Sequence, residues 1–134
     1  MDMSGVDQGL FRLLGFELVN ASADGARLRF VVNADHHQPY GIMHGGVHCA
    51  AVESAASLAA ALWLGGRGRV VGVSNRTDFI RPVTEGVLTA SSSPIDRTEF
   101  QQLWQVEIRD GAGRLVARGE VRLQALPEAA APRP

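Results

Sequence analysis

The sequence V-H-C-A-A-V-E-S-A-A-S-L-A-A-A-L-W-L, residues 47–64, is rich in Ala, Leu and Ser and contains neither Gly nor Pro. This composition favours a helix, which would extend for about 27 Å at a rise of about 1.5 Å per residue. Gly65 and Gly66 follow directly and are typical of a helix end. Glu53 is the only charged residue in the stretch. We therefore expect one long helix that is buried on all sides and carries a single acid.

The residues before this helix predict a short helical piece and a hairpin. Residues 6–14 have an apolar periodicity that suits one or two helical turns. Residues 16–22 and 26–32 alternate apolar and polar side chains around the pair Asp24-Gly25, which is usual in a tight hairpin turn. These two segments are expected to form antiparallel strands.

The residues after the helix are typical of β structure. Four further strands are expected at residues 69–80, 87–95, 99–110 and 115–125, separated by turns that contain Pro or Gly. The order of two strands, one helix and four strands predicts an α+β domain with an antiparallel sheet. One helix covers six strands poorly. Either the sheet wraps tightly around the helix, or a second copy of the chain extends the sheet and a cleft forms between subunits.

Length and composition limit the class of protein. With 134 residues the chain suits a single domain, which we assign to residues 1–125, followed by a disordered tail at residues 126–134. The net charge of −1 argues against a nucleic-acid surface. The single cysteine, Cys49, excludes an internal disulfide and no signal peptide is recognised, so a cytoplasmic protein is expected. The apolar run at residues 50–64 contains Glu53 and is shorter than the ~20 residues of a membrane span, so no membrane partner is expected.

Glu53 is a candidate for chemistry because of its neighbours. The residues around it are small and apolar, and such side chains leave space for a substrate or water beside the carboxylate. Ser57, four residues on, lies on the same helix face. The alternative is a solvated helix stripe, but such a stripe should carry several charges at i, i+4 spacing.

The start of the helix predicts a group that stabilises negative charge. His44 ends the preceding loop, and Gly45 and Gly46 open the helix, where the first backbone N–H groups have no partner within the helix and the dipole is positive. Glycine lets a substrate approach the backbone closely. These amides would stabilise the charge that develops on a carbonyl oxygen during acyl transfer. The pattern outlines an oxyanion hole, although glycine near helix ends is common by itself.

The four histidines between residues 36 and 48 also suggest a metal site. His44 and His48 have the i, i+4 spacing of the H-E-x-x-H zinc motif, and Glu53 or Cys49 is a conceivable third ligand. Gly45 follows His44, however, so the glutamate that serves as general base in that motif is missing. We expect no metal. The remaining histidines are interpreted as polar residues without a catalytic role: His36, His37 and His48.

The segment Q-P-Y-G-I-M-H-G-G at residues 38–46, followed by Glu53 and Ser57, resembles the catalytic segment of the hotdog-fold acyl-CoA thioesterases. It is most similar to the branch with 4-hydroxybenzoyl-CoA thioesterase, the proofreading thioesterase of enterobactin synthesis and 1,4-dihydroxy-2-naphthoyl-CoA thioesterase, and it is also similar to phenylacetate-pathway thioesterases. The resemblance covers nearly all of residues 15–125. It implies a hotdog fold, in which an antiparallel sheet wraps around one long central helix.

The resemblance implies a thioester hydrolase and a role for each matching residue. Glu53 matches the catalytic carboxylate, which acts as nucleophile or as general base on water. Gly45 matches the residue whose backbone N–H polarises the thioester carbonyl, and Gln38 and His44 surround the same oxygen or the leaving sulfur. Ser57 matches the hydroxyl residue that orients the carboxylate or the attacking water.

The same resemblance implies partners. The substrate is an acyl-CoA or an acyl-carrier thioester, so CoA is part of the substrate and no cofactor is implied. Members of the family assemble as homodimers that form a homotetramer, and the helix of one subunit faces the loop of its neighbour. This agrees with a sheet that one helix covers poorly.

Some positions depart from the family pattern and bear on the substrate. Phe79 occupies a position where close relatives often have a histidine, so we expect an apolar acyl pocket, suited to a phenyl, benzoyl or medium aliphatic group. Gly46 is a further candidate contact with the substrate. The segment at residues 94–99 replaces one associated with the CoA phosphates and adds two acids. Arg81 and Arg97 are the candidate phosphate ligands.

Two other functions are compatible with the sequence. A hotdog dehydratase or hydratase would also pair a histidine with an acid, but it would act on a β-hydroxyacyl or enoyl thioester. A non-catalytic acyl-CoA-binding module would keep the cleft and tolerate the loss of Glu53. The i, i+4 pairing of Glu53 with Ser57, together with Gln38, favours hydrolysis.

Overall fold

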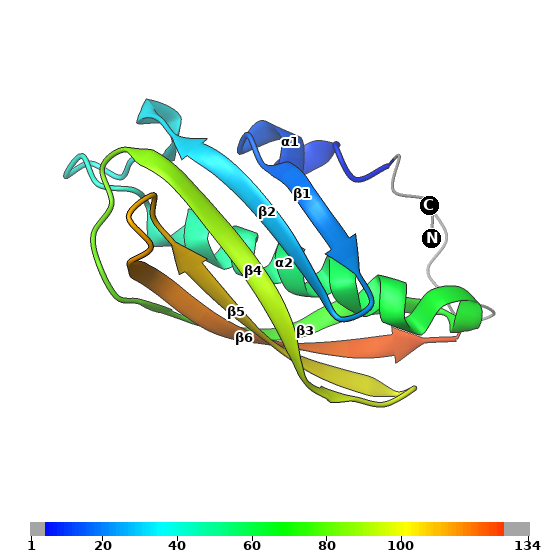
Figure 1. Cartoon of the computed structure of the whole chain (residues 1–134). Coiled ribbons are helices and arrows are strands. Elements are labelled where there is room, and N and C mark those ends of the chain that lie inside the picture. Colours follow the sequence, from blue (N-terminus) through cyan, green and yellow to red (C-terminus); the bar gives the residue numbers. More distant parts are fainter. Residues whose placement is uncertain (1–4, 128–134) are drawn as a thin grey trace.

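The structure is a computed structural model and describes residues 5–127 (Figure 1). In chain order the elements are α1 (Gly9–Leu13), β1 (Glu17–Ser22), β2 (Gly25–Val32), η1 (Ala34–His36), α2 (Gly45–Leu64), η2 (Gly65–Arg67), β3 (Arg69–Phe79), β4 (Gly86–Arg97), β5 (Gln101–Arg109) and β6 (Leu115–Leu126). Most of the predicted tail, residues 128–134, lies outside the described residues.

The strands β1 to β6 form one antiparallel sheet that wraps around α2 (Figure 1). The strand order is β1-β2-β4-β5-β6-β3, so β1 and β3 are the two edges. The hairpin between β1 and β2 closes at Ser22 and Gly25, around the predicted Asp-Gly turn. The predicted α+β architecture, an antiparallel sheet around one long central helix, is confirmed.

Helix α2 spans Gly45–Leu64, so it includes Gly45 and Gly46, which the sequence predicts to open the helix ahead of residues 47–64. Its N-cap is His44, whose Nδ1 accepts a hydrogen bond from the Gly46 N–H at 2.7 Å. Gly65 follows the helix with a φ of 60°, a conformation that glycine adopts at little cost.

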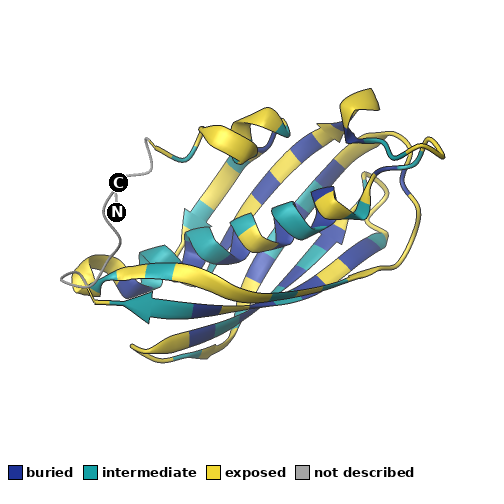
Figure 2. Ribbon diagram, turned by 180° about the vertical axis from the view of Figure 1, so that it is seen from behind, coloured by how far each residue is buried: buried dark blue, intermediate teal, exposed yellow. Residues whose placement is uncertain are grey.

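The two faces of α2 differ (Figure 2). Small and aliphatic side chains, with one histidine among them, face the sheet and let the strands approach closely. The buried members are Val47, His48, Ala51, Val52, Ala55, Ala56, Ala59, Ala60 and Leu64. Elsewhere on the helix Glu53 is exposed and Ser57 is half-buried. The prediction of a helix buried on all sides is wrong for the single chain, because the sheet reaches round only part of it.

Alternation along the strands supplies the other half of the core. In β2 every second side chain is buried: Ala26, Leu28, Phe30 and Val32. Two buried polar side chains tie the sheet to the helix. Ser92 Oγ donates to the Ala55 carbonyl at 2.8 Å, and Gln102 Nε2 donates to the Ala60 carbonyl at 3.2 Å. These hydrogen bonds offset the cost of burying polar groups in the core.

Strand β4 is longer than predicted. It continues through Pro94 to Arg97, two residues beyond the predicted strand end at residue 95. Its register against β5 shifts between Pro94 and Asp96. Proline has no N–H to donate to a neighbouring strand, and an irregularity of this kind accommodates it. The connection to β5 is therefore confined to residues 98–100.

By length and composition alone, the stretch Gly45–Arg67 is able to cross a membrane, with a mean hydropathy of 1.4. The prediction that residues 50–64 are too short to span a membrane therefore does not hold for the longer stretch Gly45–Arg67. Burial distinguishes a membrane-spanning helix from a core helix. Of this stretch's most apolar window, 56% is buried inside the fold, because the sheet wraps around it (Figure 1). It is the core helix of a soluble domain.

The edge strand β3 leaves apolar side chains uncovered. Val71, Val73 and Phe79 are exposed along it. Gly72 lies against the helix, because a Cβ at Gly72 would be 3.5 Å from the Glu53 carboxyl carbon. An edge with exposed apolar residues is a place where another strand can add to a sheet.

Candidate active site

A cavity of about 500 Å³ opens at the N-terminal end of α2, beside the end of β3. This volume is in the range of small-molecule sites. The lining includes five predicted site residues: Gln38, His44, Gly45, Phe79 and Arg81. The rest of the lining is mostly apolar: Pro39, Tyr40, Ile42, Met43, His48, Ile80, Pro82 and Val83. The structure thus brings together the loop half of the predicted site.

The Gly45 N–H donates to no acceptor among residues 5–127. It lies in the first turn of α2, at the positive end of the helix dipole. The next amide, that of Gly46, is already bonded to His44 Nδ1. A Cβ at Gly45 would overlap the Phe79 ring, so glycine is the residue that fits there. Gly45 is therefore a free donor at the cavity wall, as an oxyanion-binding group must be.

His44 and Gln38 also keep hydrogen-bond donors. His44 Nδ1 is an acceptor, so in the neutral ring the hydrogen is on Nε2. Gln38 Oε1 accepts a hydrogen bond from the Tyr40 N–H, which leaves the side-chain NH₂ of Gln38 as a donor. Together with Gly45, these residues surround one cavity with N–H groups.

Glu53 and Ser57 do not line this cavity. Glu53 is two helical turns beyond Gly45, about 12 Å along the axis at about 1.5 Å per residue. Its exposed carboxylate lies near Gly72 on the β3 edge and has no hydrogen bond or ion pair with residues 5–127. Ser57 is half-buried one turn further on. A single chain therefore separates the acid from the N–H donors.

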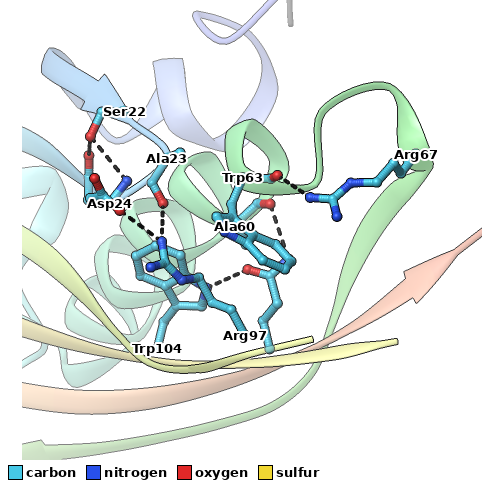
Figure 3. Close-up of polar contacts among 10 residues, drawn as sticks. Ser22, Ala23, Asp24, Ala60, Trp63, Arg67, Arg97 and Trp104 are labelled. Atoms are coloured by element: carbon cyan, nitrogen blue, oxygen red, sulfur yellow. Dashed lines mark hydrogen bonds and ion pairs between the residues drawn. The ribbon is translucent and has the colours of Figure 1, made fainter. Parts of the chain in front are cut away.

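Arg97 lies near the opposite end of α2 (Figure 3). Its Nη1 donates to the Ala23 carbonyl at 2.8 Å and to the Asp24 carboxylate at 2.9 Å. Its guanidinium carbon lies 5.5 Å from the ring centroid of Trp63 and 5.8 Å from that of Trp104. Trp63 is in the last turn of α2, which is about 27 Å from the cavity end at about 1.5 Å per residue. The structure gives Arg97 contacts within the fold and does not bring it to the cavity.

Two other histidines connect loop segments. His36 is buried, with Nδ1 accepting a hydrogen bond from the Asn33 N–H and Nε2 lying 2.8 Å from the Leu14 carbonyl oxygen. His37 Nε2 lies 2.8 Å from the Thr84 carbonyl oxygen. Both rings hold the path of the chain between β2 and α2.

His48 is different, because it is buried at the cavity wall. Its ring stacks on Phe79, with the centroids 5.7 Å apart. Burial lowers the pKa of His48 to about 4, so the ring is neutral near pH 7. The interpretation of His48 as a polar bystander overlooks this position. The available signal is its spacing, since residue 48 is one helical turn after His44 and three residues after Gly45.

No group of three or more His, Cys, Asp or Glu side chains lies in a metal-binding arrangement within the part of the chain that the structure describes. His44 and His48 border the cavity, while Glu53 lies two helical turns beyond Gly45 and does not border it. The absence of a metal or cofactor from the reaction stays a prediction.

Comparison with known protein families relates this geometry to a function. Residues 40–117 match the family described as the thioesterase superfamily. The chain belongs to this superfamily. It is 47% identical over 116 residues to a Mycobacterium tuberculosis protein named "Putative esterase Rv1847", a match covering 84% of this chain and 83% of the relative. It is 30% identical over 108 residues to the 1,4-dihydroxy-2-naphthoyl-CoA hydrolase of Listeria monocytogenes, a match covering 81% of this chain and 88% of the relative.

Two solved structures share the architecture of this superfamily member. That of the Mycobacterium tuberculosis protein superposes with a TM-score of 0.86 at 44% identity, covering 92% of this chain and 98% of the other. That of a thioesterase from Haemophilus influenzae has a TM-score of 0.85 at 30% identity, and the match covers 93% of this chain and 85% of the other. The sheet around α2 is therefore the hotdog fold, and the chain is a thioester hydrolase.

Proposed function

We propose that this thioesterase hydrolyses an aryl or medium-chain acyl-CoA to the free acid and CoA, or the matching acyl-carrier thioester. One observation carries the proposal: the unpartnered Gly45 N–H borders a cavity with mostly apolar walls. The Listeria monocytogenes relative, named for a CoA thioester, supports CoA as the leaving group. We expect a cytoplasmic enzyme that needs no metal or cofactor, since CoA is part of the substrate.

The reaction begins at the thioester carbonyl. Its oxygen accepts a hydrogen bond from the Gly45 N–H, with Gln38 and His44 as further donors. One donor of this kind contributes roughly 10²- to 10³-fold in rate. Glu53 either attacks the carbonyl carbon or removes a proton from an attacking water, and Ser57 orients the reacting group. The departing thiol needs little assistance, because its pKa is about 8.5.

The complete site requires two chains. About 12 Å of helix separates Glu53 from Gly45 within one chain. Strand β3 has an open edge with exposed apolar side chains, including Val71 and Val73. Antiparallel pairing of β3 with β3 of a second copy would cover this edge and form a homodimer. Two such dimers would make the expected homotetramer.

The contacts of β3 with α2 suggest the register of this pairing. Glu53 lies against Gly72, and Gly45 lies against Phe79. A two-fold axis between residues 75 and 76 would set Gly72 of one chain opposite Phe79 of the other. The carboxylate of one chain would then face the N–H donors of its partner.

The cavity walls support an apolar acyl group. Ile42, Met43 and Phe79 contribute apolar surface beside the thioester-binding donors. We propose that Arg81, which is exposed at the cavity rim, contacts the CoA phosphates. Gly46 is exposed but does not line the cavity, and a Cβ there would lie 2.9 Å from His44 Nδ1, so its contact with the substrate stays a prediction.

A panel of acyl-CoA substrates with a thiol-release assay tests the proposal. It should include benzoyl-, phenylacetyl- and octanoyl-CoA, and a β-hydroxyacyl-CoA whose dehydration is followed in parallel. A dehydratase would form the enoyl thioester without releasing thiol, and a binding module would catalyse neither reaction. If none of these substrates releases thiol, the proposal is overturned.

Glu53→Gln should reduce turnover by at least about 100-fold, because an amide neither attacks the carbonyl nor accepts a proton from water. The free energy of unfolding should change by less than about 0.5 kcal/mol, since Glu53 is exposed and unpaired. Glu99→Gln, at an exposed acid between β4 and β5, is the matched control and should retain the parental rate. A Glu53→Gln variant with the parental rate would refute the role of Glu53.

A further inference from the structure

Strand β3 holds α2 at a point midway between the two predicted reactive groups. The strand lies against the helix at Gly45 and again at Glu53. One helical turn from each of them, Asn75 Nδ2 donates a hydrogen bond to the Cys49 carbonyl at 2.9 Å. The side chain of Asn75 therefore ties the edge strand to the segment of α2 that carries both the amide donor and the acid.

The acceptor of this hydrogen bond belongs to the turn that ends at Glu53. In an α-helix each N–H donates to the carbonyl four residues earlier, so the Cys49 carbonyl is also the acceptor for the Glu53 N–H. The exposed Glu53 side chain has no hydrogen bond or ion pair with residues 5–127. The position of its carboxylate therefore depends on the backbone of this turn, which Asn75 holds against the sheet.

Thr77 fixes the orientation of the Asn75 amide. Its Oγ1 donates to Asn75 Oδ1 at 2.7 Å, so the amide oxygen faces Thr77 and the amide nitrogen faces the helix. Both side chains are half-buried, whereas the alternate residues Arg76 and Asp78 are exposed. Because both polar atoms of the Asn75 side chain are engaged, the amide is held in one orientation.

A similar arrangement further along α2 provides a comparison. Gln102 Nε2 donates to the Ala60 carbonyl at 3.2 Å, and Gln102 Oε1 accepts from Trp104 Nε1 at 2.8 Å. Gln102 is buried in the core, and its acceptor is almost two turns beyond Glu53, so this side chain stabilises the fold. Asn75 differs because it is on the edge strand and its acceptor is within the turn of the acid.

We propose that Asn75 is a positioning residue, which fixes the turn of α2 that carries Glu53 by holding the Cys49 carbonyl. This inference rests on the proposed thioesterase function, in which Glu53 acts on a thioester held by a second chain. A small displacement of this turn would change the distance between the carboxylate and the thioester carbonyl carbon and slow the chemical step. Substrate binding should not change, because neither Asn75 nor Cys49 lines the cavity.

Asn75→Ala tests the positioning role through the separate kinetic constants for benzoyl-, phenylacetyl- and octanoyl-CoA. We expect kcat to fall by about 10-fold or more, while KM stays within about 2-fold of the parental value. Gln102→Ala is the matched control, because it removes an equivalent pair of hydrogen bonds. It should lower the denaturation midpoint at least as much as Asn75→Ala does, yet leave kcat within about 2-fold of the parent. If kcat falls in proportion to stability in both variants, the inference is wrong.

A second measurement tests whether Asn75 acts through Glu53. In a Glu53→Gln background the carboxylate is absent, so Asn75→Ala should change the residual rate by less than about 2-fold. The effects of the two substitutions would then be far from additive. An equal loss of rate in the parent and in the Glu53→Gln background would be a general structural effect and would rule out the positioning role.

Thr77 keeps the inference testable if Asn75→Ala does not fold. Thr77→Val removes the hydroxyl that orients the Asn75 amide and should lower kcat by about 3-fold or more, whereas Thr77→Ser should retain the parental kcat. In that case parental kcat in Thr77→Val would contradict the inference. All of these results leave thiol release by the parent intact. Failure of the proposed function would instead abolish thiol release by the parent, so the two failures are distinguishable.

Discussion

Gly45 meets two requirements at one position. Its N–H is free at the start of α2, and its missing side chain leaves room for the Phe79 ring. The first requirement is predictable, because the H-G-G pattern precedes a helical stretch. The second is not, because the approach of Phe79 depends on how β3 returns along the helix.

Gly45→Ala should impair catalysis more than folding. The new Cβ would overlap the Phe79 ring, but this side chain is 56% exposed and is free to rotate away. We expect the free energy of unfolding to change by less than about 1 kcal/mol. Displacement of the ring and crowding of the donor should lower kcat/KM by about 10-fold or more.

The matched control is Gly66→Ala, because a Cβ at Gly66 would meet nothing within 4 Å. Chemical denaturation and thiol release measured on both variants separate stability from activity. A fully active Gly45→Ala enzyme would argue against the Gly45 amide as the oxyanion donor.

His48 predicts a pH dependence of stability. Its pKa is lowered to about 4 in the folded protein, so the unfolded chain binds the proton first as the pH falls below about 6.5. The free energy of unfolding therefore falls between about pH 6.5 and 4, by up to about 3 kcal/mol from this residue. Denaturation curves at several pH values should have a shallower pH dependence in His48→Leu than in the parent or in His37→Leu. Parallel curves for all three proteins would contradict the buried neutral imidazole.

The secondary structure elements are predictable where one pattern dominates. Alternating side chains predict each strand, and a stretch without Gly or Pro predicts α2. Two details at the ends of these elements are not predictable in this way. The helix starts on glycines with an imidazole cap, which is not among the usual capping residues. Strand β4 continues past the predicted end at residue 95 to Arg97, because a register shift, which depends on its neighbour β5, accommodates the missing N–H of Pro94.

Arg97 connects the β1–β2 turn, the end of α2 and β4. Arg97→Ala should lower the free energy of unfolding by about 1–2 kcal/mol, because it removes hydrogen bonds and stacking on two tryptophan rings. The KM for acyl-CoA should stay within about 2-fold of the parental value, because these contacts are at the far end of α2 from the cavity.

Arg122→Ala, at an exposed arginine of β6, is the control for loss of a positive charge. Thermal denaturation measures the first effect and steady-state kinetics the second. A large rise in KM with unchanged stability would support the sequence prediction that Arg97 binds the CoA phosphates.

At the scale of the whole molecule, the structure brings together one part of the predicted site, and the roles of its residues stay predictions. Gln38, His44 and Gly45 meet at one cavity, as their closeness in sequence suggests. Glu53 is on the same helix but faces an open sheet edge. Contacts between copies leave no periodic pattern in one chain, so the exposure of the acid is visible only in the folded structure.

Mixed dimers test whether the site is shared. Glu53→Gln and Gln38→Ala should each be nearly inactive as pure proteins. When the two variants are unfolded and refolded together, half of the dimers would be mixed, and each mixed dimer would have one intact site. We expect about a quarter of the parental activity to return. Simple mixing without subunit exchange is the control, and verified mixed dimers without activity would contradict a shared site.

The open edge of β3 also has a consequence for the rate law. If Glu53 of one chain acts only on a thioester held by another, a dilute solution contains mostly half-sites. The number of complete sites then rises with the square of the chain concentration until pairing saturates. Specific activity would fall on dilution, and the amount of protein made by the cell would determine whether thioesters are hydrolysed at all.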